Sequence, residues 1–200
     1  MIEALDHIDR RLFEVLNGLH SPFFDEWMYW VSEKWVWIPL YLLVLYAVWH
    51  RLNPRQMLLF ALSIGLLVLL TDQLASGLLK PWIGRYRPCR DEADLDFMVH
   101  IVRGHCGGAY GFASSHAANF FGLAVFVAQF FRRPWIWATA LGLASLTAYS
   151  RVYLGVHYPG DVLVGALIGA LAGWGIFALY GYALQKTATG ASRDGHINAS

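Results

Sequence analysis

Five segments of the chain are predominantly apolar, and short polar stretches separate them. A membrane-spanning helix needs about 20 apolar residues to cross about 30 Å of hydrocarbon. The first segment reaches this length because the aromatic turn 27–31 extends the continuous apolar run 35–49. We therefore predict an all-α, polytopic membrane helical bundle with about five transmembrane helices. The predicted spans are residues 26–49, 56–80, 115–131, 135–149 and 162–183.

The two ends of the chain follow other patterns. Residues 1–19 place apolar side chains at helical spacing, and charged side chains fill the other face. This pattern predicts an amphipathic helix that lies in the membrane interface, and it lacks the continuous apolar core of a signal peptide. Residues 186–200 are small and polar, so we expect a disordered tail after a single membrane domain of residues 1–185. Within the last span, Gly165, Gly169 and Gly173 recur four apart, which predicts a helix-packing face.

Composition supports the membrane assignment. The chain is 57% hydrophobic and 14% charged, whereas a soluble domain is about 25% charged. No basic run suggests a nucleic-acid partner. Cys89 and Cys106 both fall in the long polar loop 81–114, and neither belongs to the C-x-x-C pair typical of zinc sites. The two either form a disulfide, which requires an oxidising compartment, or remain separate thiols.

Polar, chemistry-bearing residues gather in three clusters at the ends of the predicted spans. These clusters are 80–88, 114–116 and 150–161. Ionisable groups are costly at a membrane boundary, so they indicate function by default. Counting five alternating crossings places all three clusters on one face of the membrane. The short connections and the tail on the other face carry an excess of basic residues, which predicts that this other face is cytoplasmic and that the clusters face outward. Those basic residues are Arg51, Arg55, Arg132, Arg133, Lys186 and Arg193.

Three of the clustered cations suit a phosphate group. Arg87 and Arg151 offer forked donors that match phosphate oxygens, and Lys80 adds a point charge. Ser114 or Ser115 is placed to cap the third span, whose free backbone N–H groups would point at an anion. The alternative is a set of arginines that extend to lipid headgroups without a common role.

Two histidines share this location, and a set of arginines that extend to lipid headgroups does not explain them. His157 and Asp161 are four residues apart, and Pro159 suits the first turn of the fifth span. The carboxylate can accept a hydrogen bond from one imidazole nitrogen, which leaves the other nitrogen free to attack. His116 is then placed to protonate the leaving oxygen as a general acid.

These residues form motifs that resemble the three signatures of the type 2 phosphatidic acid phosphatase superfamily. The motifs are Lys-x6-Arg-Pro from Lys80, Ser-x-His from Ser114, and Ser-Arg-x5-His-x3-Asp from Ser150. The resemblance implies a helical bundle, no metal or cofactor, and a covalent phosphohistidine. It implies His157 as nucleophile, Asp161 as its orienting partner and His116 as general acid. It also implies that Lys80, Arg87, Ser114 and Arg151 hold the phosphate.

One position departs from the family pattern. Ser115 stands where the usual Pro-Ser-Gly-His has glycine, so a side chain occupies a place where a backbone amide normally approaches phosphate. Ser115 is therefore a candidate substrate contact whose role the sequence leaves open.

The sequence thus predicts a metal-independent phosphatase that acts on a membrane lipid phosphate or diphosphate. Its expected location is the bacterial inner membrane, with the site open to the periplasm or outside. Candidate substrates are undecaprenyl diphosphate, phosphatidylglycerol phosphate, phosphatidic acid and lipid A. Two other hypotheses are a lipid phosphotransferase that uses the same histidine, and a non-catalytic membrane protein that binds lipid headgroups. Both the lipid substrate and the bilayer are expected partners in the leading hypothesis, and nucleic acid is not.

Overall fold

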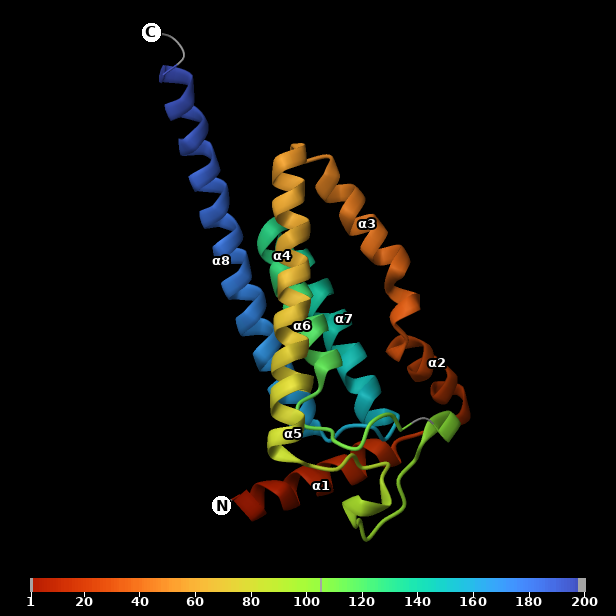
Figure 1. The fold of residues 1–200 in the computed structure, drawn as a ribbon. Coiled ribbons are helices and arrows are strands. Elements are labelled where there is room, and N and C mark those ends of the chain that lie inside the picture. Colours follow the sequence, from red (N-terminus) through yellow and green to blue (C-terminus); the bar gives the residue numbers. More distant parts are fainter. Residues whose placement is uncertain (1, 105, 198–200) are drawn as a thin grey trace.

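The computed structural model describes residues 2–104 and 106–197, and no β-strand occurs in these ranges. Long helices stand side by side, and the N-terminal helix lies across one end of them (Figure 1). The principal helices in chain order are α1 (Ile2–Gly18), α2 (Pro22–Ser32), α3 (Ile38–Trp49), α4 (Pro54–Asp72), α5 (Lys80–Ile83), α6 (Ser115–Phe131), α7 (Pro134–Tyr153) and α8 (Pro159–Ile197). A π-helical segment, η2 (Gln73–Leu79), joins α4 to α5, and a 3-10 turn, η1 (Lys34–Trp37), precedes α3.

Two stretches of helix in the described residues are long and apolar enough to cross a membrane. They are Pro54–Ile83, which combines α4, η2 and α5, and Pro159–Lys186 of α8. The predicted first span is a broken helix: α2 and the helix that continues through α3 meet at an angle of 68°. The break occurs at Glu33, whose φ of −79° and ψ of 127° are those of extended backbone. If this bent pair counts as one span, the number rises to three. The expected count of about five remains a prediction.

Two helix ends differ from the sequence prediction. Helix α7 continues to Tyr153, so Ser150 and Arg151 lie in its last turns and not in the connection that follows. Helix α8 continues to Ile197, past residue 186, where the sequence suggested a disordered tail. Residues 198–200 of that predicted tail lie outside the described residues.

The glycine face of α8 packs directly on the backbone of α6. A Cβ atom added at Gly169 would lie 2.1 Å from the carbonyl oxygen of Ala118. At Gly165 and Gly173 the corresponding distances to carbonyl oxygens of Ser114 and Gly122 are both 2.4 Å. Small residues permit such close approach of membrane helices, as the sequence predicted. This contact sets the start of α8 beside the start of α6.

The loop between α5 and α6 folds back on itself at the end of the bundle where α1 lies (Figure 1). The backbone N–H of Arg87 donates to Ala109 at 3.1 Å, and that of Gly111 donates to Arg85 at 2.8 Å. These bonds flank an antiparallel bridge between Tyr86 and Tyr110. The two arms of the loop are thereby held as a short ribbon, which fixes Arg85 and Arg87 in space.

We expect Gly169→Ala to lower the thermal stability of the protein. The added methyl group would meet backbone that cannot move aside without separating α6 from α8, and such overpacking costs about 1–3 kcal/mol. The measurement is the melting temperature of the purified protein in detergent. The matched control is Gly175→Ala on the same helix, where an added Cβ meets no described atom within 4 Å. Equal melting temperatures for the two variants would contradict the packing argument.

Candidate active site

The buried pair His157 and Asp161 lies between α7 and α8. Helix α8 begins at Pro159, which places Asp161 in its first turn. Asp161 Oδ2 lies 3.5 Å from His157 Nδ1 and accepts a hydrogen bond of 3.0 Å from the backbone N–H of Tyr158. Both side chains are buried, at 1% and 0% exposure. The carboxylate of Asp161 therefore faces Nδ1 of the His157 ring and does not occupy the Nε2 side.

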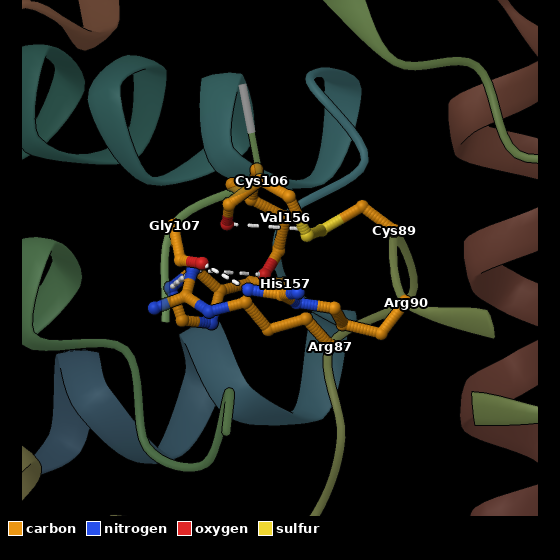
Figure 2. The surroundings of a disulfide bond; sticks show 7 residues. All are labelled: Arg87, Cys89, Arg90, Cys106, Gly107, Val156 and His157. Atoms are coloured by element: carbon orange, nitrogen blue, oxygen red, sulfur yellow. Dashed lines mark hydrogen bonds between the residues drawn. A yellow bond between two sulfur atoms is a disulfide. The ribbon is translucent and has the colours of Figure 1, made fainter. Parts of the chain in front are cut away.

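Arg87 occupies the other side of the imidazole ring. Its Nη1 lies 3.3 Å from His157 Nε2 and 3.3 Å from the carbonyl oxygen of Val156. Figure 2 draws these residues beside the disulfide. A guanidinium can only donate, so the facing nitrogen must offer its lone pair. Nε2 is then the unprotonated nitrogen, and Nδ1 carries the proton toward Asp161. This is the tautomer in which Nε2 can act as a nucleophile.

The electrostatic setting of His157 favours the neutral imidazole. Burial lowers its pKa well below the ordinary value, and the positive charges of Arg87, Arg151 and Lys80 lower the pKa further. Three cations from two of the sequence clusters thus act on one ring. Their positive charge favours an anion beside His157.

Lys80 and the two serines of the second cluster meet at the start of α6. Lys80 Nζ donates to Ser115 Oγ at 3.0 Å and to Ser76 Oγ, on the π-helical segment η2, at 2.9 Å. Ser114 caps α6, because its Oγ accepts from the backbone N–H of Ala117 at 3.4 Å. Of the two serines, Ser114 is therefore the helix cap, and Ser115 holds the lysine.

His116 follows in the first turn of α6. It lies within electrostatic reach of Arg151, His157 and Lys80. The backbone N–H of Ser114, two residues earlier, donates to the carbonyl oxygen of Asp161 at 3.0 Å. The hydrogen bond between Ser114 and Asp161 ties the His116 turn to the His157 turn.

Arg151 approaches from the last turn of α7, and its Nη1 donates to Ser32 Oγ at the end of α2. Ser32 is buried and lies directly before the break at Glu33. The broken first span therefore supplies a contact that orients one of the site cations. Sequence reasoning did not identify Ser32 or Ser76 as parts of the site, since neither belongs to a motif.

A second set of contacts that the sequence did not reveal lies behind Asp161. Arg85 Nη1 lies 3.0 Å from Asp161 Oδ1 and 2.6 Å from Asp9 Oδ2, and Arg85 Nη2 lies 2.8 Å from Asp6 Oδ1. Asp9 Oδ1 also accepts from the backbone N–H of Gly160 at 2.7 Å. The sequence contains only a weak signal for these contacts. Asp6 and Asp9 lie three residues apart on one face of α1, and Arg85 lies inside the first cluster without an assigned role.

The polar loop covers the site. A Cβ atom at Gly111 would lie 2.8 Å from Asp161 Oδ2 and 3.6 Å from His157 Nδ1, so a larger residue would displace the pair. Cys89 and Cys106 form a disulfide in the same loop, with an S–S distance of 1.97 Å (Figure 2). Arg90 Nη2 donates to Gly107 at 2.6 Å beside it. These contacts join the arm that carries Arg87 to the arm that carries Gly111.

The composition of the site suits an anion with several oxygens. No group of three or more His, Cys, Asp or Glu side chains that could hold a metal ion occurs among the described residues. Forked arginines, a lysine and a capped helix N-terminus instead surround a buried imidazole. Such donors bind phosphate oxygens, and the helix N-terminus adds its dipole.

Comparison with known proteins agrees with this chemistry. The chain is 41% identical over 174 residues to a lipid A 4'-phosphatase of Bacteroides thetaiotaomicron, covering 87% of this chain and 77% of the relative. It is 33% identical to the Porphyromonas gingivalis protein of the same name, covering 99% and 83%. The crystal structure of a transmembrane PAP2 type phosphatidylglycerolphosphate phosphatase from Bacillus subtilis superposes with a TM-score of 0.65 at 25% identity, covering 92% and 87%.

The family model of the PAP2 superfamily matches residues 56–185. This range includes all three clusters and more than half of the chain. The chain belongs to the PAP2 superfamily.

Proposed function

We propose that this membrane hydrolase of lipid phosphates acts through a covalent phosphohistidine on His157. The observation that carries the proposal is the setting of that ring. Asp161 lies on its Nδ1 side, Nε2 offers a lone pair, and three cations converge on it. A neutral, oriented imidazole beside a phosphate-binding set of donors is the arrangement that nucleophilic catalysis at phosphorus requires.

In the first step, the Nε2 lone pair attacks phosphorus and the bond from phosphorus to the lipid oxygen breaks. Lys80, Arg87 and Arg151 balance the charge on the equatorial oxygens. His116 gives its proton to the departing lipid oxygen, and the negative phosphate favours the protonated form of His116 that this step needs. Asp161 stabilises the positive charge that develops on the ring of His157.

In the second step, a water molecule attacks the phosphohistidine. His116 takes a proton from that water, a new phosphorus–oxygen bond forms, and the bond from phosphorus to Nε2 breaks. Inorganic phosphate leaves and the free imidazole is restored. If a lipid hydroxyl replaced water in this step, the product would be a new lipid phosphate, which is the transferase alternative.

For the substrate, we propose a phosphorylated glycolipid of the lipid A class. Support comes from two relatives that are 41% and 33% identical to this chain, cover 87% and 99% of it, and carry the name lipid A 4'-phosphatase. Phosphatidylglycerol phosphate, undecaprenyl diphosphate and phosphatidic acid are the comparison substrates. Every one of them offers the same terminal phosphate to the cations.

We also propose five spans, with α2 and α3 together as the first and α6 and α7 as the third and fourth. The site would then lie at the outer surface of the inner membrane. Two features support this orientation: the excess of basic residues at the opposite end of the bundle, and a disulfide that needs an oxidising compartment.

We expect His157→Ala to abolish phosphate release. Without Nε2 no phosphoenzyme forms, and loss of a catalytic nucleophile reduces turnover by about 10³-fold or more. The assay is phosphate release by purified protein from the four lipids named above, with an added lipid acceptor to reveal transfer. The control is His7→Ala, an exposed histidine on α1. Wild-type turnover in His157→Ala would contradict the mechanism, and headgroup binding without turnover in the wild type would favour the non-catalytic alternative.

We expect the ring of His157 to stay neutral in mildly acidic solution. Burial and three neighbouring cations lower its pKa, so the proton binds only at a pH well below the ordinary value of about 6.5. In ¹⁵N-histidine NMR, the signals missing from His157→Ala should therefore not titrate between pH 8 and 5.5. A titration midpoint near 6.5 would overturn this expectation.

We expect both cysteines to resist thiol reagents in protein purified without reductant. Cys89 and Cys106 are the two cysteines of the chain, and the structure joins them. After denaturation, a maleimide-polymer should label neither until a reductant is added. In Cys89→Ser, Cys106 should react without reductant. Labelling of the unreduced wild type would argue against the disulfide and weaken the outward orientation.

A further inference from the structure

We propose that Asp9 on α1 is a positioning residue: through Arg85 it fixes the carboxylate of Asp161, which in turn orients His157. The inference rests on the proposed function, because it assigns Asp9 a part in aiming the nucleophile. It also gives α1 a role in the reaction, beyond that of a membrane anchor.

Asp9 reaches Asp161 by two routes. Its Oδ2 accepts from Arg85 Nη1 at 2.6 Å, and the same Nη1 donates to Asp161 Oδ1 at 3.0 Å. Its Oδ1 accepts at 2.7 Å from the backbone N–H of Gly160, the residue directly before Asp161. One carboxylate therefore contacts both the partner of the Asp161 side chain and the backbone next to it. A Cβ at Gly160 would lie 2.7 Å from Asp9 Oδ2, so a side chain there would push the Asp9 carboxylate from its present position.

Arg85 is distinguished from the phosphate-binding cations by its partners. Its guanidinium pairs with the carboxylates of Asp6, Asp9 and Asp161, and it lies over the ring of Tyr158 at 3.8 Å. These carboxylates already neutralise its charge and accept hydrogen bonds from both of its Nη atoms. Arg87, by contrast, faces the imidazole and a backbone carbonyl. Arg85 therefore connects Asp6 and Asp9 of α1 with Asp161.

Of the two acids of α1 that pair with Arg85, Asp9 holds it more firmly, because its contacts are better shielded from water. The side chains of Arg85 and Asp9 are 18% and 14% exposed, and Asp161 is fully buried. Charge-assisted hydrogen bonds are strong where water competes little. Asp6 is 38% exposed and shares its carboxylate with Arg10, so its hold on Arg85 is weaker.

Helix α1 has further contacts that hold it in place. Phe13 is fully buried, with its ring centroid 5.3 Å from that of Tyr158. Asn17 Nδ2 donates to the carbonyl oxygen of Tyr153 at 2.8 Å. Another face of α1 carries exposed apolar side chains that suit a lipid surface: Leu5, Ile8, Leu12 and Val15. A change at Asp9 can therefore alter the site while α1 remains docked.

The test is Asp9→Asn, which keeps an oxygen for the N–H of Gly160 and removes the charge that holds Arg85. With the lipid phosphate that the wild type hydrolyses best, we expect kcat to fall by about 10-fold or more while KM changes less than about two-fold, as for other groups that orient a reacting side chain. The melting temperature should stay close to the wild-type value. The ¹⁵N signals of His157 should shift, because its partner carboxylate is less firmly held.

Two further variants test whether Asp9 acts on the site through Arg85. Glu14→Gln, on the same helix, removes an acid that pairs with Arg11 at the exposed surface, and it should leave kcat, KM and the His157 signals unchanged. In an Arg85→Gln background, Asp9→Asn should cause little additional loss, since sites that act through one another are not additive.

Wild-type kcat and unshifted His157 signals in Asp9→Asn would overturn the proposal. So would a loss of kcat that follows a fall in melting temperature without any change at His157. If the wild type releases no phosphate from any lipid phosphate, the proposed function fails. The NMR comparison then still decides whether Asp9 controls the setting of His157.

Discussion

A carboxylate that is fully buried must be paired, and the pairing of Asp161 organises this structure. Its side chain meets Arg85 from the polar loop, the backbone of Tyr158 and the ring of His157, while its carbonyl accepts from Ser114 at the start of α6. Two segments distant in sequence, the polar loop and the start of α6, therefore converge with the turn of His157 on one acid. Each of them brings a group that the proposed chemistry uses or supports.

This convergence depends on how closely the helices approach. The glycine face of α8 lets its backbone touch that of α6, so the turn with His157 and the turn with His116 lie together. The same closeness gathers Lys80, Arg87 and Arg151 around one imidazole, where their repulsion favours an anion. An empty cluster of cations is costly, and a bound phosphate relieves that cost. The phosphate affinity and the oriented nucleophile that we propose for this site thus have a common structural origin.

Much of the fold and site could be predicted because the signals are local. The spacing of His157 and Asp161, with Pro159 between them, predicts that both side chains meet at a helix start. The four-residue repeat of glycines predicts a packing face, and the helical spacing of apolar residues in 1–19 predicts an amphipathic helix. Ser114 and Ser115 were both candidates for the cap of α6, and geometry assigns the cap to Ser114 and the lysine contact to Ser115.

The sequence by itself determined the candidate residues for the proposed chemistry and most of the helices, since motif spacing and hydrophobic period follow from local geometry. Only the tertiary structure decided that α1 turns Asp9 toward Arg85, that Ser32 receives Arg151 at a broken helix, and that Ser115 receives Lys80. These pairs are separated by 76, 119 and 35 residues. No periodicity records such contacts, because packing of distant segments creates them.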